Sequence, residues 1–194
     1  MMFCKFIIIA ALAFSSFACG LGPDMSKDRI PGTPTPTPFI PDKPIGDYLR
    51  DGATAYAAGN FAEAVVHYKK AFEIEQREQK LEKKERRELI AHLATAYSRT
   101  GDAKNARLAV AYGLSKDFNA PTYHYALACS FSSEGDPSTA LYHLRAAFGF
   151  RDKLLPSEKL GEPLKDPCFA DFADDAEFKK AVVEMKNEPL RDKD

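Results

Sequence analysis

Histidines are the first side chains to consider for chemistry, because they act as general bases and as metal ligands near neutral pH. The chain has four of them, and it contains no HExxH, CxxC, GxSxG or glycine-rich phosphate-binding motif. His67 and His143 occupy equivalent positions in the repeat described below, so a repeat position explains them better than a metal pair. We expect both, like His92 and His124, to lie at the surface or half-buried. The sequence therefore predicts no enzyme, no metal site and no cofactor.

Two cysteines and a group of acids are the other candidates for a site. Cys129 follows three apolar residues, 126–128, in a helical pattern, which predicts a small buried thiol. Cys168 lies in the C-terminal segment; in an oxidising compartment it could form a disulfide with Cys129, and two separate thiols are the alternative. A set of nearby acids could hold a cation, although helix capping explains them better: Asp171, Asp174, Asp175 and Glu177.

The first 18 residues differ from the rest of the chain. Fifteen of them are hydrophobic, Lys5 is the early cation, and uninterrupted apolar residues run from Phe6 to Phe14. A membrane-spanning helix needs about 20 such residues. One cation, a short apolar stretch and then small residues are typical of a secretory signal peptide, which we assign to residues 1–18. A buried or anchoring N-terminal helix is the alternative, and the proline-rich sequence that follows argues against it.

Cys19 comes directly after this segment. The arrangement resembles a bacterial lipoprotein signal, in which the cysteine is acylated and becomes the mature N-terminus. The resemblance implies lipid chains such as palmitate on Cys19 and a periplasm-facing site on the bacterial envelope. Gly20 and not an acid follows, which resembles an outer-membrane rather than an inner-membrane address. Ser16 stands where the usual signal has an aliphatic residue, so cleavage after Ala18 to give a soluble periplasmic or secreted protein is the alternative.

Residues 19–46 are rich in proline. Seven of these 28 residues are proline, against six in all the rest of the chain. The run from Pro31 to Pro38, PGTPTPTP, favours extended polyproline II and offers no regular hydrogen-bond ladder. We expect a disordered tether that spans about 80 Å when fully stretched. A PxxP ligand for an aromatic groove is the alternative.

A two-helix pattern recurs three times between residues 47 and 155. Each copy has a Gly, then an Asn or Asp, then an Ala five residues after the Gly: Gly59, Asn60 and Ala64; Gly101, Asp102 and Ala106; Gly135, Asp136 and Ala140. Apolar residues at spacings of three and four lie on both sides of each turn. The Gly should end one helix, the next residue should cap the following helix, and the Ala should permit close helix crossing. From Gly101 to Gly135 is 34 residues, and the arrangement resembles the tetratricopeptide repeat.

This resemblance implies an all-α fold, a short right-handed superhelical solenoid of about three helix–turn–helix units. The predicted units cover about residues 47–77, 86–119 and 120–154. A solenoid needs a cap because its last helix otherwise exposes an apolar face. Residues 156–194 are predicted to supply a C-terminal helical cap through Phe169, Phe172, Phe178 and Val182, with a frayed tail from Glu188 to Asp194.

The first two units are eight residues too far apart. The surplus lies in residues 75–88, where 11 of 14 residues are charged, six positive and five negative. Helix formers dominate there, so we expect two helices that each extend by about a turn. A solvated helix extension is the simpler interpretation, and a docking site for a charged partner is the alternative.

The repeat family implies a concave groove, lined by the first helix of each unit, that accepts an extended peptide or a partner helix. The positions that map to this groove are Leu49, Ala53, Tyr56, Ala91, Thr95, Ser98, Arg99, Tyr125, Cys129 and Ser132. Tyr56, Arg99 and Tyr125 are of the types that contribute most to interface energy. Arg99 is the only cation among them, so recognition of a terminal carboxylate is not supported.

The expected function is that of a non-catalytic protein–protein interaction scaffold, lipid-anchored in the bacterial envelope, with an envelope protein as partner. The alternative is an accessory regulator or a subunit of an envelope enzyme, transport or motility machine. With 27 Lys and Arg against 28 Asp and Glu, the net charge is −1, which argues against a nucleic-acid partner. No small-molecule substrate is expected.

Overall fold

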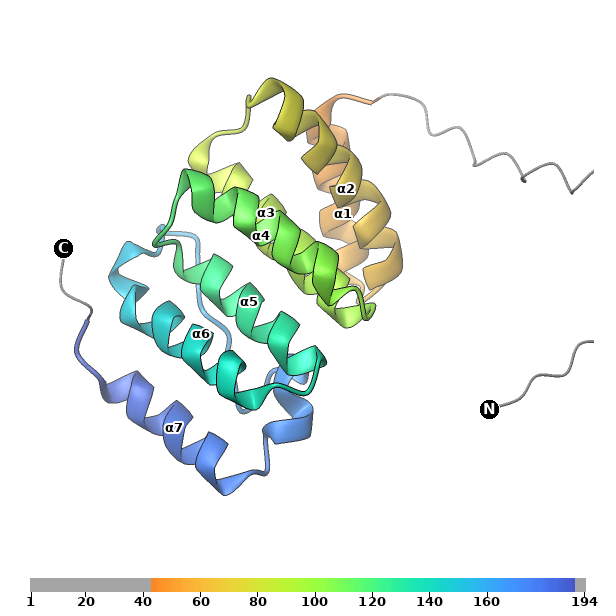
Figure 1. The fold of residues 1–194 in the computed structure, drawn as a ribbon. Coiled ribbons are helices and arrows are strands. Elements are labelled where there is room, and N and C mark those ends of the chain that lie inside the picture. The colour runs from red at the N-terminus through yellow and green to blue at the C-terminus, as the bar shows by residue number, and fades with distance from the viewer. Residues whose placement is uncertain (1–42, 191–194) are drawn as a thin grey trace, which may run out of the picture. The chain divides into compact units, whose positions relative to one another are not determined.

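The computed structural model describes residues 43–190, and this part of the chain is helical, without a β-strand. Its elements are α1 (Ile45–Ala57), α2 (Phe61–Glu78), α3 (Lys83–Arg99), α4 (Ala103–Lys116), α5 (Pro121–Ser133), α6 (Pro137–Gly149), η1 (Arg151–Lys153), η2 (Pro167–Phe172) and α7 (Ala176–Asn187) (Figure 1). The all-α class is confirmed. The predicted signal peptide, Cys19 and the tether up to residue 42 lie outside the described residues. No helix between residues 43 and 190 is both long and apolar enough to cross a membrane.

Consecutive helices pack as three pairs, α1 with α2, α3 with α4 and α5 with α6. The pairs lie side by side, because α3 contacts both α2 and α5, and α4 contacts α5 (Figure 1). The helix bounds lie close to the predicted units. The largest difference is at α6, which ends at Gly149 where the predicted unit runs to residue 154, and α1 begins at Ile45, inside the segment assigned to the tether.

The turn inside each pair has the predicted chemistry. Each ends on a glycine with positive φ, +74°, +81° and +76° respectively: Gly59, Gly101 and Gly135. A side chain at the next position accepts a hydrogen bond from the backbone N–H three residues later, and these caps are Asn60, Asp102 and Asp136. Glycine adopts this left-handed conformation without the penalty that a Cβ brings, and the caps satisfy otherwise unpaired N–H groups.

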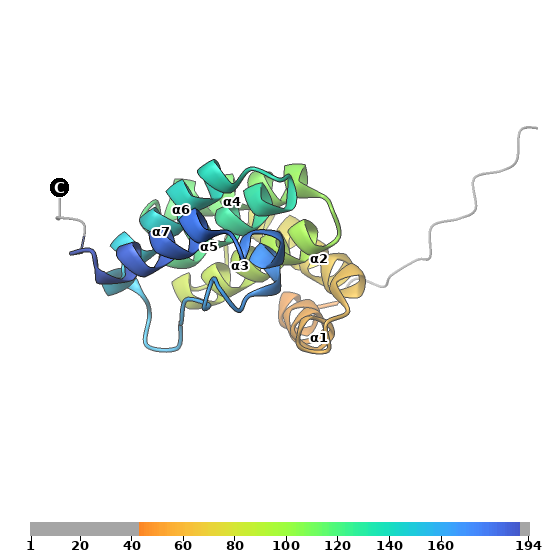
Figure 2. The same ribbon diagram turned by 90° about the horizontal axis from the view of Figure 1, so that it is seen from below.

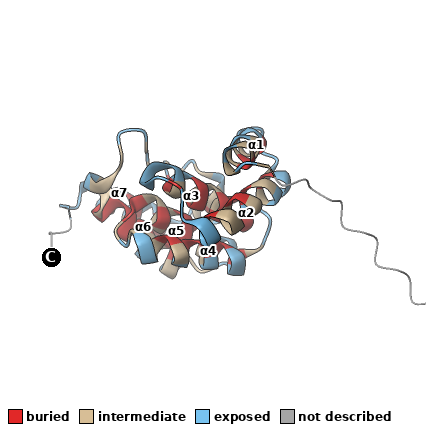
Figure 3. Cartoon of the chain, turned by 90° about the horizontal axis from the view of Figure 1, so that it is seen from above, coloured by how far each residue is buried: buried red, intermediate tan, exposed pale blue. Residues whose placement is uncertain are grey.

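Small side chains let the helices of a pair approach closely. Ala64, Ala106 and Ala140 are completely buried, as the repeat pattern predicts. Figure 3 shows buried residues between the helices and exposed residues along their outer faces. The core is therefore a series of interfaces between neighbouring helices, and α5, whose residues before Ser133 are all buried or half-buried, lies deepest in it.

The charged insertion at residues 75–88 is not merely solvated, so the simpler interpretation is wrong in part. Helices α2 and α3 are extended, at 18 and 17 residues, but Gln79 takes a left-handed conformation that ends α2. Glu75 is completely buried, where its carboxylate accepts from Leu81 N at 2.9 Å and from Arg86 Nε at 2.7 Å. The loop between α2 and α3 is therefore held against the two helices. Leu81 of this loop is buried, and the ion pair between Glu75 of α2 and Arg86 of α3 connects the helices beside it.

The C-terminal residues cover the last helix pair, as predicted. Phe169, Phe178 and Val182 are buried in one cluster with Leu144 and Cys129, and Phe172 packs against that cluster. Helix α7 packs on α6. The prediction that the chain frays from Glu188 onward is wrong for Glu188 itself. The Glu188 carboxylate pairs with Arg145, and the Glu188 carbonyl accepts a hydrogen bond from Arg151. Residues 191–194 lie outside the described part.

Candidate functional site

Five of the ten predicted groove residues line one cavity of about 210 Å³. They come from the first helix of each pair and are Tyr56 of α1, Ala91 and Thr95 of α3, and Tyr125 and Cys129 of α5. The same side of the array carries two further cavities, of about 440 and 270 Å³, which both reach Glu88 of α3. Leu49 and Ala53 line the second of these, between α1 and the beginning of α3.

Helix α3 forms the floor that these cavities share. Its residues Glu88, Ala91 and Thr95 are exposed or half-buried and follow one another at helical spacings of three and four. They therefore lie on one face of α3, along a line from the charged end of the helix toward its C-terminus. Ala91 lines two of the cavities, and its small side chain leaves the floor open at that point.

A non-helical segment lies across the cavities from α3 and forms their other wall. We call residues 154–166, between η1 and η2, the crossing segment. In Figure 2 it passes along the side of the array on which α1 also lies, and in Figure 1 it runs behind α5 and α6. Its residues Lys159, Leu160 and Gly161 line the 210 Å³ cavity opposite α3.

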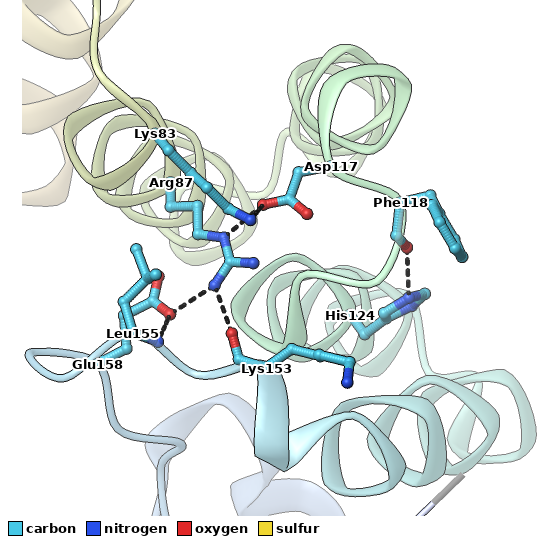
Figure 4. Close-up of polar contacts among 8 residues, drawn as sticks. All are labelled: Lys83, Arg87, Asp117, Phe118, His124, Lys153, Leu155 and Glu158. Carbon is cyan, nitrogen blue, oxygen red and sulfur yellow. Dashed lines mark hydrogen bonds and ion pairs between the residues drawn. The ribbon is translucent and has the colours of Figure 1, made fainter. Parts of the chain in front are cut away.

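Arg87 holds the beginning of the crossing segment. This side chain is 1% exposed, and its guanidinium donates to Asp117 Oδ2 at 2.7 Å, to the carbonyl of Lys153 at 2.9 Å and to Glu158 Oε2 at 2.8 Å (Figure 4). Burial opposes the charge of Arg87, but the two carboxylates outweigh it and raise the pKa of the guanidinium. The cost of burying one charge is thus offset by acceptors from three separate segments.

Tyr125 of α5 contacts the end of the crossing segment, and Ser132 of α5 contacts the beginning of η2. The Tyr125 hydroxyl donates to Asp166 Oδ2 at 2.8 Å, and Ser132 Oγ donates to the carbonyl of Cys168 at 2.7 Å. A Cβ at Gly161 would collide with the Tyr125 hydroxyl, so the backbone passes close to this ring. Burial and the neighbouring Asp166 carboxylate raise the pKa of Tyr125, which keeps the hydroxyl protonated as a donor.

The ten predicted positions are divided among three separate cavities, and the last of these, of about 300 Å³, is lined by Ser98, Arg99, Cys129 and Ser132 beside η2. Ser98 and Ser132 are 5% and 4% exposed, and their hydroxyls donate to carbonyls of this chain, those of Ala94 and Cys168. Cys129 is 1% exposed. The guanidinium of Arg99 lies over the Phe61 ring, 5.2 Å from its centroid. The open part of the groove lies between α1 and the crossing segment, along α3.

An aromatic group forms the α1 side of the open part. The Tyr56 ring stacks on His92 at 4.4 Å, and the Tyr68 hydroxyl is 3.1 Å from Nδ1 of the same imidazole. Burial lowers the pKa of His92, so the ring is neutral at pH 7, and burial raises the pKa of Tyr56 to about 12. This side of the groove therefore offers neutral aromatic faces and a few hydrogen-bonding edges.

Cys129, Cys168 and Asp166 bring potential metal-ligand atoms within 4.8 Å of one another. The sequence analysis considered Cys129 and Cys168 as a possible pair but did not expect Asp166 beside them, because η2 brings these residues onto α5 from nearly 40 residues away. Four protein ligands form the usual structural zinc site, and these three residues supply one fewer. Both Asp166 oxygens already accept hydrogen bonds, from the Tyr125 hydroxyl and from Cys168 N. The residues therefore fit a complete zinc site poorly.

The histidines are half-buried, as expected. His143 stacks on Phe131 at 5.3 Å and lies 5.9 Å from His124, centroid to centroid. Burial and the nearby His124 lower the pKa of His143 to about 4. These two rings belong to an aromatic group between α5 and α6, on the second-helix side of that pair.

Sequence reasoning missed Arg87 and the path of the crossing segment. Pro156, Gly161 and Pro163 do indicate a non-helical stretch after the third pair. Which face that stretch crosses depends on contacts 30 to 70 residues apart, such as Arg87 with Glu158, and no local pattern reports those.

No protein-family model matches the chain, and no curated protein matches it significantly.

Proposed function

We propose that this protein is a non-catalytic binding module whose groove holds a non-helical peptide segment of a partner protein. The three helix pairs are, in this proposal, tetratricopeptide units arranged as a right-handed solenoid. Lipid on Cys19 anchors the module in the bacterial envelope, on the periplasmic side, and residues 19–46 separate the lipid from the helices. The partner is an envelope protein.

One observation carries the proposal: the groove already accommodates a non-helical segment of its own chain. The crossing segment meets α5 at Tyr125, whose hydroxyl donates to the Asp166 carboxylate and whose ring lies against the backbone at Gly161. A close approach of this kind to an extended backbone does not require the bound segment to be a helix. The neighbouring length of α3 offers the same type of surface, with Thr95 and His92 beside the Tyr56 ring, and it is not covered.

The dimensions of the open part agree with a short peptide. Its floor runs from Glu88 to Thr95, which is about two helical turns, and the walls are α1 and the crossing segment. The cavity at the beginning of α3 carries Lys84 and Lys159 together with Glu88 and Glu158, so its charges are mixed, and the neutral aromatic group borders the neighbouring cavity. A segment with an apolar residue that reaches the aromatic group fits this surface. So short a groove gives modest affinity by itself.

The test places a large side chain in the groove. Ala91→Arg in the full chain puts a long charged side chain on the floor, and it should abolish capture of the partner from detergent-solubilised membranes. Ala111→Arg is the matched control: Ala111 is exposed on α4 and lines none of the cavities described above, so capture should be unchanged.

Both variants should keep the wild-type helical circular dichroism and melting temperature. Unchanged capture by a folded Ala91→Arg variant would overturn the proposal. Equal loss in both variants would place the binding surface elsewhere.

A further inference from the structure

Two thiols from distant parts of the chain meet beside the crossing segment. Cys129 lies on α5, where it is 1% exposed, and Cys168 lies at the beginning of η2, where it is half-buried. Their sulfur atoms and a carboxylate oxygen of Asp166 all lie within 4.8 Å of one another. Both cysteines are free thiols in this structure.

The surroundings hold Cys168 against Cys129. The carboxylate of Asp166 accepts from Cys168 N at 2.9 Å and caps η2, and Ser132 Oγ donates to the Cys168 carbonyl at 2.7 Å. Ser132 is three residues after Cys129 on α5, so one turn of helix carries both the thiol and the backbone clamp. A disulfide needs a sulfur–sulfur distance of about 2.05 Å, and the two sulfur atoms already lie within 4.8 Å of each other.

We propose that Cys129 and Cys168 form a disulfide that fastens the end of the crossing segment over α5. The two thiols lose two protons and two electrons, and an exchangeable disulfide, such as that of a thiol–disulfide oxidoreductase or of oxidised glutathione, gains both and leaves as two thiols. Cys168 is the more exposed sulfur and forms the mixed disulfide first. The Cys129 sulfur then attacks Cys168 and releases the second thiol of the oxidant.

A disulfide fits this pair better than a metal ion. The cluster supplies three ligand atoms, one fewer than the four protein ligands of a structural zinc site. Asp166 is already committed to the Tyr125 hydroxyl and to Cys168 N. A covalent bond removes the buried thiols without creating a charge, so it suits an apolar cluster that also holds Phe169 and Leu144.

The bond has a consequence for the groove. The disulfide closes a covalent loop that contains the end of α5, α6, η1 and the crossing segment. It keeps the crossing segment in place over α5. After reduction, the end of the crossing segment is held by the hydrogen bonds of Tyr125 and Ser132 and by the packing of Leu160, Leu164 and Cys168 on the apolar cluster. The effect on partner binding rests on the proposed function, and an oxidising compartment in the cell rests on the predicted signal peptide. Formation of the bond rests on neither.

The test maps the bond in the purified full chain. The protein is incubated with oxidised glutathione, alkylated with N-ethylmaleimide and digested with trypsin. We expect peptides 117–145 and 166–179 to be joined, and alkylation of both thiols to fall roughly ten-fold against a sample kept reduced. Amide hydrogen exchange across residues 159–168 should slow by a similar factor in the oxidised sample, and Cys168→Ser should show neither change.

Two results would overturn the inference. One is full alkylation of both thiols after oxidation in a protein that keeps its helical circular dichroism. The other is one zinc ion per chain, retained through dialysis and released on alkylation, which would make the cluster a metal site. Neither readout involves a partner, so failure here is distinct from failure of the groove proposal.

Discussion

At the scale of single residues, Arg87 connects three parts of the molecule. Its guanidinium joins Asp117 at the end of α4, the carbonyl of Lys153 at the end of η1 and Glu158 of the crossing segment (Figure 4). A buried charge of this kind specifies an arrangement more than it adds stability, because desolvation cancels much of the attraction. Removing it is nevertheless costly, since the carboxylates would remain behind without the guanidinium.

Arg87→Met should lower the free energy of unfolding by about 3 kcal/mol, because it removes the cation that pairs with Glu158 and leaves Asp117 with Lys83 alone. Urea unfolding followed by circular dichroism measures this change. Arg145→Met is the matched control: Arg145 pairs with Glu188 at the surface, and the loss should stay below about 1 kcal/mol. Equal losses in the two variants would contradict the role assigned to Arg87.

His143 should make stability depend on pH between about 6.5 and 4. Its folded-state pKa of about 4 lies below its ordinary value of 6.5, chiefly because of burial, so the unfolded chain binds the proton first as the pH falls. The stability is complete above pH 6.5 and decreases until the folded pKa is reached. His143→Phe keeps the stack on Phe131 and should reduce the loss between pH 7 and pH 4 by about 1 kcal/mol.

Thermal unfolding of wild type and variant at both pH values measures this difference. Tyr142→Phe, a change in the neighbouring ring that leaves His143 in place, should follow the wild-type pH profile. A His143→Phe profile parallel to wild type would show that His143 does not titrate in this range.

At the scale of elements, two glycines inside helices permit close ring packing. A Cβ on Gly52 of α1 would come within 2.7 Å of the Tyr68 ring, and a Cβ on Gly113 of α4 within 2.7 Å of the Tyr123 ring. Both rings are 1% exposed or less. Each glycine therefore makes room for a buried tyrosine on a neighbouring helix.

Gly113→Ala should lower the free energy of unfolding by about 1–2 kcal/mol, because overpacking against Tyr123 exceeds the gain in helix propensity. Gly46→Ala is the matched control, since nothing lies within 4 Å of its added Cβ in α1, and it should raise stability by about 0.5 kcal/mol. Chemical denaturation measures both. An increase for Gly113→Ala would show that Tyr123 moves aside at little cost.

The helices were predictable from sequence because their determinants are local. A turn glycine, the cap that follows it and the alanine five positions later act within one turn, and in the structure each of the three copies does what its sequence indicates. The groove was predictable only in part. The positions of Tyr56, Ala91 and Thr95 in the groove follow from the helix pattern. The path of the crossing segment near Cys129 depends instead on the contacts Tyr125–Asp166 and Arg87–Glu158, which join residues far apart in the sequence.

At the scale of the whole described chain, the C-terminal segment has two roles. Helix α7 and η2 cover the apolar face of the last pair, as the cap of a helical array must. The crossing segment, which precedes η2, also lines the cavities along α3 opposite that helix. A single stretch of about 35 residues thus determines both where the array ends and how much of its groove stays open.

The measurement that tests the groove most directly is site-specific photo-crosslinking in living cells. A benzoylphenylalanine at Lys159, which is exposed at the edge of the cleft, is compared with one at Lys104, which is exposed on α4 outside the cavities described above. The groove proposal predicts a discrete protein adduct from position 159 that disappears when Ala91→Arg is added, and no such adduct from position 104. An adduct from position 104 alone, or one from position 159 that persists beside Ala91→Arg, would contradict it.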